Sequence, residues 1–209
     1  MYRYRVMNTF ENLDKLLHFL IVKYKDMNNS WKSSELYSEV NLKKCLVADI
    51  EKHDEIMNLI WNYHAFLKMQ QLNLLPGISQ LQSSDNIYAR IKQANSIQNK
   101  INIYMNRSIE GKVPINKCFN DLLGFRIVID ADFSFEQLKE HLHESFDSLK
   151  LIDSTKNDYK AYHIYFQDGN KVFPWELQVW KKSNEKSNLE SHHKYKQDYT
   201  TWEKKHKNK

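Results

Sequence analysis

The stretch DLLGFRIVID, residues 121–130, constrains the fold of this chain more than any other. Residues 125–129 are aromatic or β-branched except for Arg126, and this pattern predicts a β-strand. Near-continuous apolarity is typical of an interior strand that is buried on both faces. Because an unpaired guanidinium is costly away from water, we expect Asp121 and Arg126 to lie where the strand meets a polar cavity. The alternative is a structural ion pair between them at the end of the strand.

The composition indicates one large globular domain, or one domain with an extension. The 209 residues include only 4 glycines and 3 prolines, which disfavours a turn-dense all-β fold. The longest apolar run, near Leu16 to Val22, is interrupted by His18 and is too short to cross a bilayer, so we expect no membrane partner. The first residues show no secretion signal, and Cys45 and Cys118 have no metal-ligand spacing. We therefore expect reduced thiols and a cytoplasmic location.

Positive charge is concentrated near the C-terminus. The net charge is +5, and residues 181–209 carry 9 basic against 4 acidic side chains, while the other residues carry 22 of each sign. A basic segment of this kind is usually a solvated helix face. It is also the simplest way to attract a phosphate-rich partner such as RNA or a nucleotide. Composition leaves both interpretations open.

The first third of the chain is predicted to be helical. Apolar residues at helical spacing predict a helix over 10–27. A second, long helix is predicted from behind Ser33-Ser34 to the Pro76-Gly77 pair, which would end it. This part carries no functional motif. We therefore divide the chain into a helical N-terminal extension, residues 1–82, which serves in packing or contacts a partner, and a second domain, residues 83–209.

A strand and a helix after residue 85 carry a group of polar and basic side chains. Alternation over 87–91 predicts the strand, and the pattern becomes helical from Ala94 to about Arg107. The group consists of Arg90, Lys92, Ser96 and Lys100. The first two share a face of the strand, and the last two are one helical turn apart. With the amides of the helix N-terminus they would form a pocket for anions; an exposed helix face explains the same spacing.

The second half of the chain is predicted to mix helices and strands. The predicted elements are a helix over 133–146, a strand over 149–152, a hairpin of 159–166 and 171–180, and a basic helix over 183–208. Glu176 and Gln178 share a face of the second hairpin strand, which is otherwise apolar. A lone glutamate in such a strand should be paired, bound to a metal or placed at a cavity.

Five short motifs occur in order over about residues 84–200. They are R-I-K-x-x-x-S-x-x-x-K at 90–100, D-L-L-G-F-R-I at 121–127, Y-K-A-Y-H at 159–163, E-L-Q at 176–178 and E-S-H-H-K-Y-K at 190–196. In this order and spacing they resemble the RelA/SpoT alarmone synthetase domain. The resemblance implies a nucleotidyltransferase-like α/β (α+β) fold, in which helices flank a mixed β-sheet. It also implies transfer of the β,γ-pyrophosphate of ATP to the 3′-hydroxyl of a second nucleotide.

The resemblance also assigns roles on the side of the pyrophosphate donor. Asp121 and Glu176 would be the catalytic residues and would hold Mg²⁺, and Glu176 would take the proton of the attacking hydroxyl. Attack on phosphorus needs charge neutralisation and alignment, which two carboxylates and a metal supply. The implied ATP-binding residues are Arg90, Lys92, Ser96, Lys100 and Arg126. The two arginines would enclose the adenine, which a planar guanidinium can do and a lysine cannot, and the other three would bind the phosphates.

On the acceptor side, the resemblance implies a second set of residues. The acceptor-binding residues are Tyr159, His163 and Gln178, and the supporting residues are Lys160, Glu190, Tyr195 and Lys196. Tyr159 would stack on the base of the acceptor. Structural alternatives remain open: a core aromatic at Tyr159, a hydrogen-bonded structural histidine at His163, and a partner across the hairpin at Gln178.

The sequence departs from the family where the acceptor should bind. Many relatives carry a K-D-Y-I-x-x-P-K loop before a G-Y-R-S-x-H motif, whereas here only residues 153–157 precede D-Y-K-A-Y-H. The loop is largely missing, the glycine has become Asp158 and the serine Ala161. Because that loop helps to shape the side for a guanine nucleotide, we favour a toxic small alarmone synthetase that pyrophosphorylates the 3′-CCA end of tRNA, a polyanion suited to the basic C-terminal segment.

Two other functions remain open. The chain could make (p)ppGpp or ppApp from free nucleotides such as GDP and GTP, or it could be a catalytically silent module that binds a nucleotide or RNA. The presence of both Asp121 and Glu176 argues against the silent module. The resemblance to toxic synthetases adds two candidate partners, an antitoxin protein and a second copy of the chain in a homo-oligomer.

Overall fold

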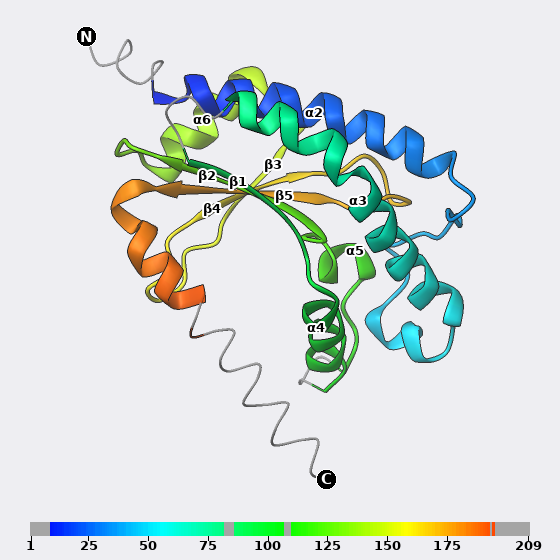
Figure 1. The fold of residues 1–209 in the computed structure, drawn as a ribbon. Helices are drawn as coiled ribbons and strands as arrows, with labels where there is room; N and C mark the ends of the chain where they lie inside the picture. Colours follow the sequence, from blue (N-terminus) through cyan, green and yellow to red (C-terminus); the bar gives the residue numbers. More distant parts are fainter. Residues whose placement is uncertain (1–8, 82–85, 107–109, 193, 195–209) are drawn as a thin grey trace.

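The computed structural model describes residues 9–81, 86–106, 110–192 and 194, and its centre is a five-stranded sheet (Figure 1). The strands lie in the order β1-β2-β5-β4-β3. Their bounds are β1 Asn86–Ile91, β2 Leu123–Ile129, β3 Lys150–Asp153, β4 Tyr162–Phe166 and β5 Trp175–Lys181. β2 and β5 run parallel, and the other neighbours run antiparallel. This mixed sheet with flanking helices confirms the predicted α+β fold class.

The strand predicted from the stretch 121–130 is β2, and it lies inside the sheet. It pairs with β1 on one side and with β5 on the other. Every residue of β2 is buried except Arg126, which is half-buried. The prediction of an interior strand that is buried on both faces is therefore confirmed.

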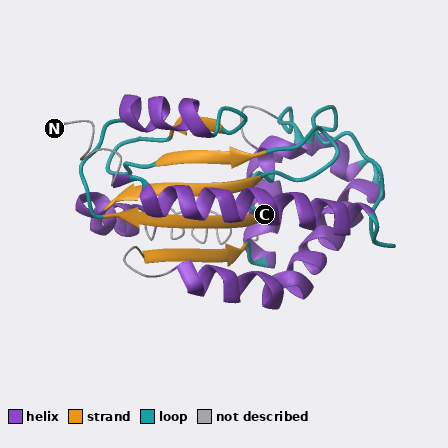
Figure 2. Ribbon diagram, turned by 90° about the horizontal axis from the view of Figure 1, so that it is seen from above, coloured by secondary structure: helices purple, strands orange, loops and turns teal. Residues whose placement is uncertain are grey.

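Three helices cover one face of the sheet, as Figures 1 and 2 show from two directions. They are α2 Glu11–Lys32, α3 Asp54–Leu81 and α6 Phe135–Ser145. The apolar stripe of α2, which includes Leu13, Leu17 and Leu20, is fully buried. One hydrophobic core joins this helical layer to the sheet. The N-terminal helices thus shield one face of the sheet from water.

The opposite face is bordered by other helices. α4 Ala94–Asn106 and α5 Ile115–Cys118 lie at one end of it, and a helix over 185–192, preceded by a 3-10 turn (η2 Lys182–Asn184), lies at the other (Figure 1). Asn188 is fully buried and fastens this last helix to the segment before β4. Its side-chain oxygen accepts from Lys160 N at 2.7 Å, and its side-chain nitrogen donates to Lys160 O at 2.9 Å.

The long helix predicted behind Ser33-Ser34 is wrong in its first part. Residues 33–53 form turns and a short 3-10 helix, η1 Val47–Glu51, and the α-helix begins only at Asp54. The backbone of this segment bonds to distant loops instead: Leu42 N donates to Asn170 O at 2.7 Å, and Leu42 O accepts from Asn116 N at 3.1 Å. Tertiary hydrogen bonds replace the helical ones here.

The predicted end of that helix at Pro76-Gly77 is also wrong, because α3 continues through the pair to Leu81. A Cβ built on Gly77 would lie 2.4 Å from Cε2 of Phe19 on α2, which is far inside van der Waals contact. The glycine therefore permits the close approach of α2 and α3. Helix packing, and not a turn, explains a glycine at this position.

Most other predicted elements are confirmed with shifts of a few residues at their ends. Both strands of the hairpin begin later than predicted, β4 at Tyr162 and β5 at Trp175. Tyr159 instead pairs with Lys156 across a tight local turn. The predicted helix over 183–208 is described only up to residue 192 and at residue 194. No helix among the described residues is long and apolar enough to span a membrane.

The helical layer generates a stability prediction. Leu17→Ala removes a fully buried side chain of α2, and we expect it to lower the free energy of unfolding by roughly 2–5 kcal/mol. Val22→Ala on the same helix is the matched control, because Val22 is 56% exposed and its loss should cost less than about 0.5 kcal/mol. Urea unfolding followed by circular dichroism measures both. Equal costs would contradict the assignment of α2 to the core.

Candidate active site

The register of four strands places a set of polar and aromatic side chains on the sheet face opposite α2 and α3. The set comprises Tyr88 and Arg90 on β1, Arg126 on β2, His163 and Tyr165 on β4, and Glu176, Gln178 and Trp180 on β5. Residues that are in register across neighbouring strands point to the same side of a sheet. Alternation therefore sends Phe125 and Leu177 into the core and their polar neighbours to the other face.

A pocket of about 200 Å³ lies over the middle of this face. Its walls come from β1, β2 and β5 and from Leu189 and His192 on the helix over 185–192. Gly124 is the register partner of both Arg90 and Glu176. A Cβ at Gly124 would meet no other atom within 4 Å, so the missing side chain keeps the space between the arginine and the glutamate open.

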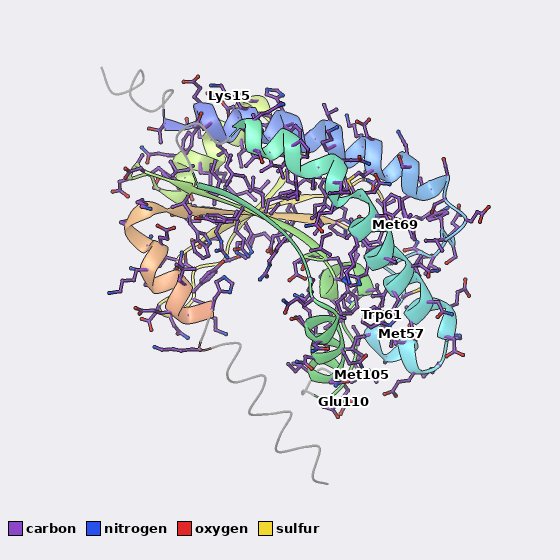
Figure 3. All side chains as sticks on the ribbon, in the orientation of Figure 1. Lys15, Met57, Trp61, Met69, Met105 and Glu110 are labelled. Carbon is purple, nitrogen blue, oxygen red and sulfur yellow. The ribbon has the colours of Figure 1, made fainter. Side chains whose placement is uncertain are left out.

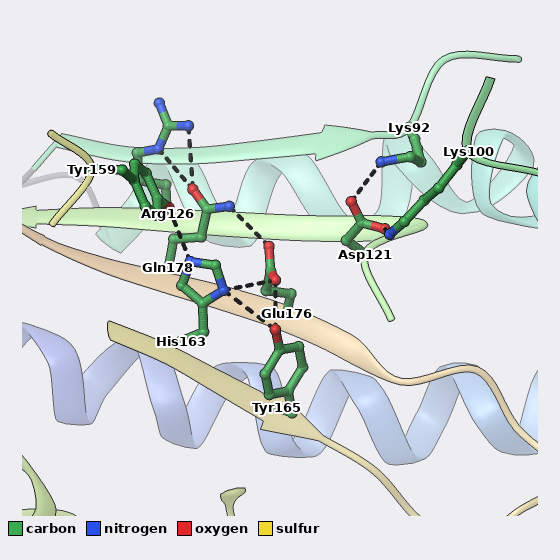
Figure 4. A network of polar contacts seen from close by, with 9 residues as sticks. All are labelled: Lys92, Lys100, Asp121, Arg126, Tyr159, His163, Tyr165, Glu176 and Gln178. Carbon is green, nitrogen blue, oxygen red and sulfur yellow. Dashed lines mark hydrogen bonds and ion pairs between the residues drawn. The ribbon is translucent and has the colours of Figure 1, made fainter. Parts of the chain in front are cut away.

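Asp121 lies just before β2 and forms ion pairs with two lysines (Figure 4). Lys92 Nζ is 2.5 Å from Oδ2, and Lys100 Nζ is 3.0 Å from Oδ1. The three side chains are only 12–17% exposed. Burial alone would raise the pKa of Asp121, but the charges of Lys100 and Lys92 hold that pKa well below its usual value. The cluster is thus an ionised carboxylate between two cations, with one net positive charge at the end of the pocket face.

Glu176 is the centre of a second polar network (Figure 4). Its Oε1 accepts from Tyr165 Oη at 2.9 Å and lies 3.0 Å from His163 Nδ1, and its Oε2 accepts from Gln178 Nε2 at 2.9 Å. Burial would raise the pKa of Glu176, but the hydrogen bond and charge of His163 outweigh it and lower that pKa. A carboxylate that accepts several hydrogen bonds stays ionised at neutral pH.

His163 links Glu176 to Tyr159. Because an ionised carboxylate only accepts, Nδ1 of the imidazole donates to Glu176, and Nε2 shares a hydrogen bond of 2.9 Å with Tyr159 Oη. Burial raises the pKa of Tyr159 to about 12, so the hydroxyl keeps its proton. Polar contacts thus connect the Glu176 carboxylate on β5, the His163 imidazole on β4 and the Tyr159 hydroxyl in the loop before β4.

Arg126 lies on the other side of Glu176. Its guanidinium carbon is 3.5 Å from the centroid of the Trp180 ring. Its Nε and one terminal nitrogen point to Gln178 Oε1 at 3.4 and 3.3 Å. Burial lowers the pKa of Arg126, but an arginine remains charged at neutral pH because its usual pKa is so high.

The structure brings most of the predicted site residues together in three places. Arg90, Arg126, Glu176 and Gln178 line the pocket; Lys92, Lys100 and Asp121 form the charged cluster; Tyr159 and His163 follow Glu176 along the network. Ser96 is half-buried on the first turn of α4. The side chains of Lys160 and Glu190 are exposed, outside both networks, and Tyr195 and Lys196 lie outside the described residues.

Sequence reasoning missed several side chains of this face. They are Tyr88, Tyr165, Trp180, Leu189 and His192. Tyr165 and Trp180 stand two residues after His163 and Gln178, so strand alternation alone could have placed them on the site face. They were overlooked because aromatic residues in a strand usually belong to the core. The two residues of the last helix carried no such signal, since only the tertiary fold brings that helix over the pocket.

The donor atoms of this face suit one class of metal ion. Among the residues that the structure describes, no group of three or more histidine, cysteine, aspartate or glutamate side chains comes together in the manner of a complete metal site. Mg²⁺, however, is commonly held by one or two protein carboxylates together with phosphate oxygens of a substrate. The ionised Asp121 and Glu176 are two carboxylates that fit that donor set.

The charged cluster generates a prediction about acid stability. The pKa of Asp121 is lower in the folded chain than its unfolded value of about 3.9. Its contribution to stability is therefore present above that value and is lost as the pH falls through the folded pKa. Asp121→Asn leaves two buried ammonium groups unpaired, and we expect it to cost roughly 3–5 kcal/mol at pH 7. The difference from wild type should shrink below about pH 4.

Urea unfolding of both proteins at pH 7, 5, 4 and 3 measures this difference. Glu11→Gln is the control, because Glu11 forms an exposed pair with Lys15, and such pairs contribute little. A cost of Asp121→Asn that is the same at every pH would contradict the ionised pairing.

Comparison with known proteins identifies the family of this chain. The family described as "Region found in RelA / SpoT proteins" matches residues 89–200, more than half of the chain. No curated protein sequence matches significantly. Among solved structures, similar chains include small alarmone synthetase 1 from Bacillus subtilis, with a TM-score of 0.41 and 20% identity over 70% of this chain and 82% of that one.

Two further solved structures are similar at the same level. Small alarmone synthetase 1 from Bacillus subtilis bound to AMPCPP gives a TM-score of 0.36 and 15% identity over 71% of this chain and 81% of that one. Small alarmone synthetase 2 from Bacillus subtilis gives 0.37 and 17% over 70% and 83%. The family match over residues 89–200 stands by itself, and by it the chain belongs to the RelA/SpoT family.

Proposed function

We propose that the chain transfers the pyrophosphate of ATP to the 3′-hydroxyl of a nucleotide acceptor, as an ATP-dependent pyrophosphokinase of the RelA/SpoT type. The observation that carries the proposal is the pair of ionised carboxylates, Asp121 among two lysines and Glu176 in the pocket wall, on one face of the sheet. A binding module has no need to hold two acids next to a triphosphate. Phosphoryl-type transfer needs them, because it depends on charge neutralisation and alignment.

ATP would bind with its phosphates toward the charged cluster. Lys92 and Lys100 already balance one carboxylate with two cations, so the end of the face is positive where a polyanion would arrive. Ser96, on the first turn of α4, stands where a helix N-terminus favours phosphate. The planar guanidinium groups of Arg90 and Arg126 line the pocket and suit the adenine.

Mg²⁺ would be held by Asp121 and Glu176, and when bound it would neutralise charge on the phosphate oxygens during transfer. Glu176 is ionised because of its hydrogen bonds, so it can accept the hydrogen bond and then the proton of the attacking 3′-hydroxyl. Tyr165 and His163 fix the position of its Oε1. The rotamer of the Glu176 side chain, the proposed general base, is thereby fixed before a substrate binds.

For the acceptor we favour the 3′-CCA end of tRNA, which would make the protein a toxin that blocks translation. Two features support this choice: the shortened segment before Tyr159 and the basic excess of residues 181–209. Tyr159 would stack on the terminal base, with His163 beside it. Such a toxin acts in the cytoplasm, is expected to have an antitoxin protein as partner, and can assemble as a homo-oligomer.

A guanine or adenine nucleotide is the second candidate acceptor, which would make the protein a (p)ppGpp or ppApp synthetase. It needs the same donor side as the first candidate, because Asp121, Glu176 and the pocket between Arg90 and Arg126 serve ATP with either acceptor.

The acceptor assay decides between these candidates. We expect γ-³²P-labelled ATP with Mg²⁺ to label deacylated tRNA but not a GDP/GTP mixture, and periodate oxidation of the 3′ adenosine should abolish the label. Glu176→Gln should lose transfer by at least about 10³-fold and still bind an ATP analogue. A labelled guanosine product would establish the second candidate. Label on neither acceptor, or unchanged activity of Glu176→Gln, would refute the proposed chemistry.

Tyr159 provides a separate prediction about the acceptor side. Stacking of a base on an aromatic ring contributes about 1–3 kcal/mol, so Tyr159→Ala should raise the KM for the acceptor roughly tenfold or more. Tyr159→Phe keeps the ring and loses only the hydrogen bond to His163, so it is the matched control and should change that KM much less. The affinity for an ATP analogue should change less than about twofold in both. Equal loss of ATP affinity in Tyr159→Ala would place the ring on the donor side.

A further inference from the structure

Arg126 separates a buried indole from the pocket. Trp180 is fully buried and is not part of the pocket wall, whereas Arg126 is part of that wall. The guanidinium carbon stands 3.5 Å from the centroid of the Trp180 ring, the distance of direct van der Waals contact. One side of the guanidinium is therefore covered by the indole, and its other side is available to whatever enters the pocket.

Gln178 fixes the edge of the same guanidinium. Its Nε2 donates to Glu176 Oε2 at 2.9 Å, so its amide cannot flip without losing that bond, and its Oε1 is presented to Arg126. The two Arg126–Gln178 contacts, 3.4 and 3.3 Å, lie at the long end for hydrogen bonds. The indole therefore contributes more to holding the guanidinium in place, and the amide determines which edge points toward Glu176.

The surroundings of Trp180 hold the indole rigid. His192 stacks on it at 5.6 Å between ring centroids, and Tyr159 meets it edge-on at 6.0 Å. Arg126 is itself half-buried, and a half-buried cation needs compensation for lost hydration. The face of Trp180, the aromatic ring with the strongest attraction for cations, and the Gln178 carbonyl oxygen supply it.

We propose that Trp180 and Gln178 are positioning residues that hold Arg126 as a flat platform for the purine base of the donor nucleotide. Because two nitrogens of the guanidinium point to Gln178, the group offers the pocket a face for stacking more than an edge for a phosphate. Tyr88, the register partner of Arg126, and Leu189 border the same pocket with half-exposed side chains. These neighbours suit a flat, apolar base. The identity of the base as that of ATP rests on the proposed function.

The experiment compares a nucleotide with its phosphates alone. Trp180→Leu removes the aromatic face and Trp180→Phe keeps a smaller one, and isothermal titration calorimetry measures their binding to α,β-methylene-ATP and to inorganic tripolyphosphate. We expect Trp180→Leu to weaken binding of the analogue about tenfold. Binding of tripolyphosphate should change less than about twofold, and Trp180→Phe should restore most of the loss.

Trp175→Phe is the matched control. Trp175 is equally buried on the same strand, but it faces the core, where it donates to Tyr63 Oη at 3.0 Å. Its replacement should lower stability and leave the affinity for the analogue unchanged. Loss of analogue and tripolyphosphate binding by the same factor in Trp180→Leu, or no loss of either, would overturn the inference.

A double-mutant cycle covers the case in which Trp180→Leu does not fold. Trp180→Met and Arg126→Lys are combined, because methionine fills the space without an aromatic face and lysine keeps the charge and removes the plane. If the indole acts through Arg126, Arg126→Lys should weaken analogue binding less in the Trp180 variant than in the wild-type chain. Strictly additive losses of analogue affinity would refute this. Binding tests are independent of catalysis. A wild-type chain that binds the analogue in this way but transfers no pyrophosphate would refute the proposed function and leave the platform in place.

Discussion

The parallel pairing of β2 with β5 is the constraint on which the rest of the structure depends. It sets Gly124 beside Glu176 and Arg126 beside Gln178, and it divides the side chains of both strands between a dry face and a polar one. Parallel pairing needs a long crossover connection, and here the chain between β2 and β5 supplies α6, β3 and β4. β4 then returns antiparallel to β5 and brings His163 opposite Gln178. One register thus orders all four strands that carry the site.

Burial of charge on the polar face is stabilised by two different means. Asp121 is paired directly with two ammonium groups, so its negative charge is neutralised within one cluster. Glu176 and Arg126 do not touch each other; an amide lies between them and satisfies both. The first arrangement leaves one net positive charge, and the second fixes two groups at a set spacing. Figure 3 shows side chains filling the layer between the sheet and the helices α2 and α3, so that layer has no room for these charged groups.

The sequence predicts the strands of the site better than it predicts their surroundings. Period-two alternation places Arg126 on β2 and Glu176 and Gln178 on β5, because a strand has only two faces and one of them is apolar. The helical spacing of α2 is equally plain. Residues 33–53 could not be predicted, since their backbone is bonded to loops more than 60 residues away in the chain. In the sequence, the Pro76-Gly77 pair predicts a turn, whereas in the fold Gly77 allows α2 and α3 to pack closely.

The side-chain amide of Asn188 forms two hydrogen bonds with the backbone of Lys160: it accepts from the N–H and donates to the carbonyl oxygen, as a neighbouring β-strand would. The loop that carries Tyr159 and the helix that carries His192 are therefore one mechanical unit. To pull them apart would leave a buried side chain and two backbone groups without partners, at a cost of about 1–3 kcal/mol for each unsatisfied group. The two hydrogen bonds thereby help to set the distance of 5.3 Å between the ring centroids of Tyr159 and His192.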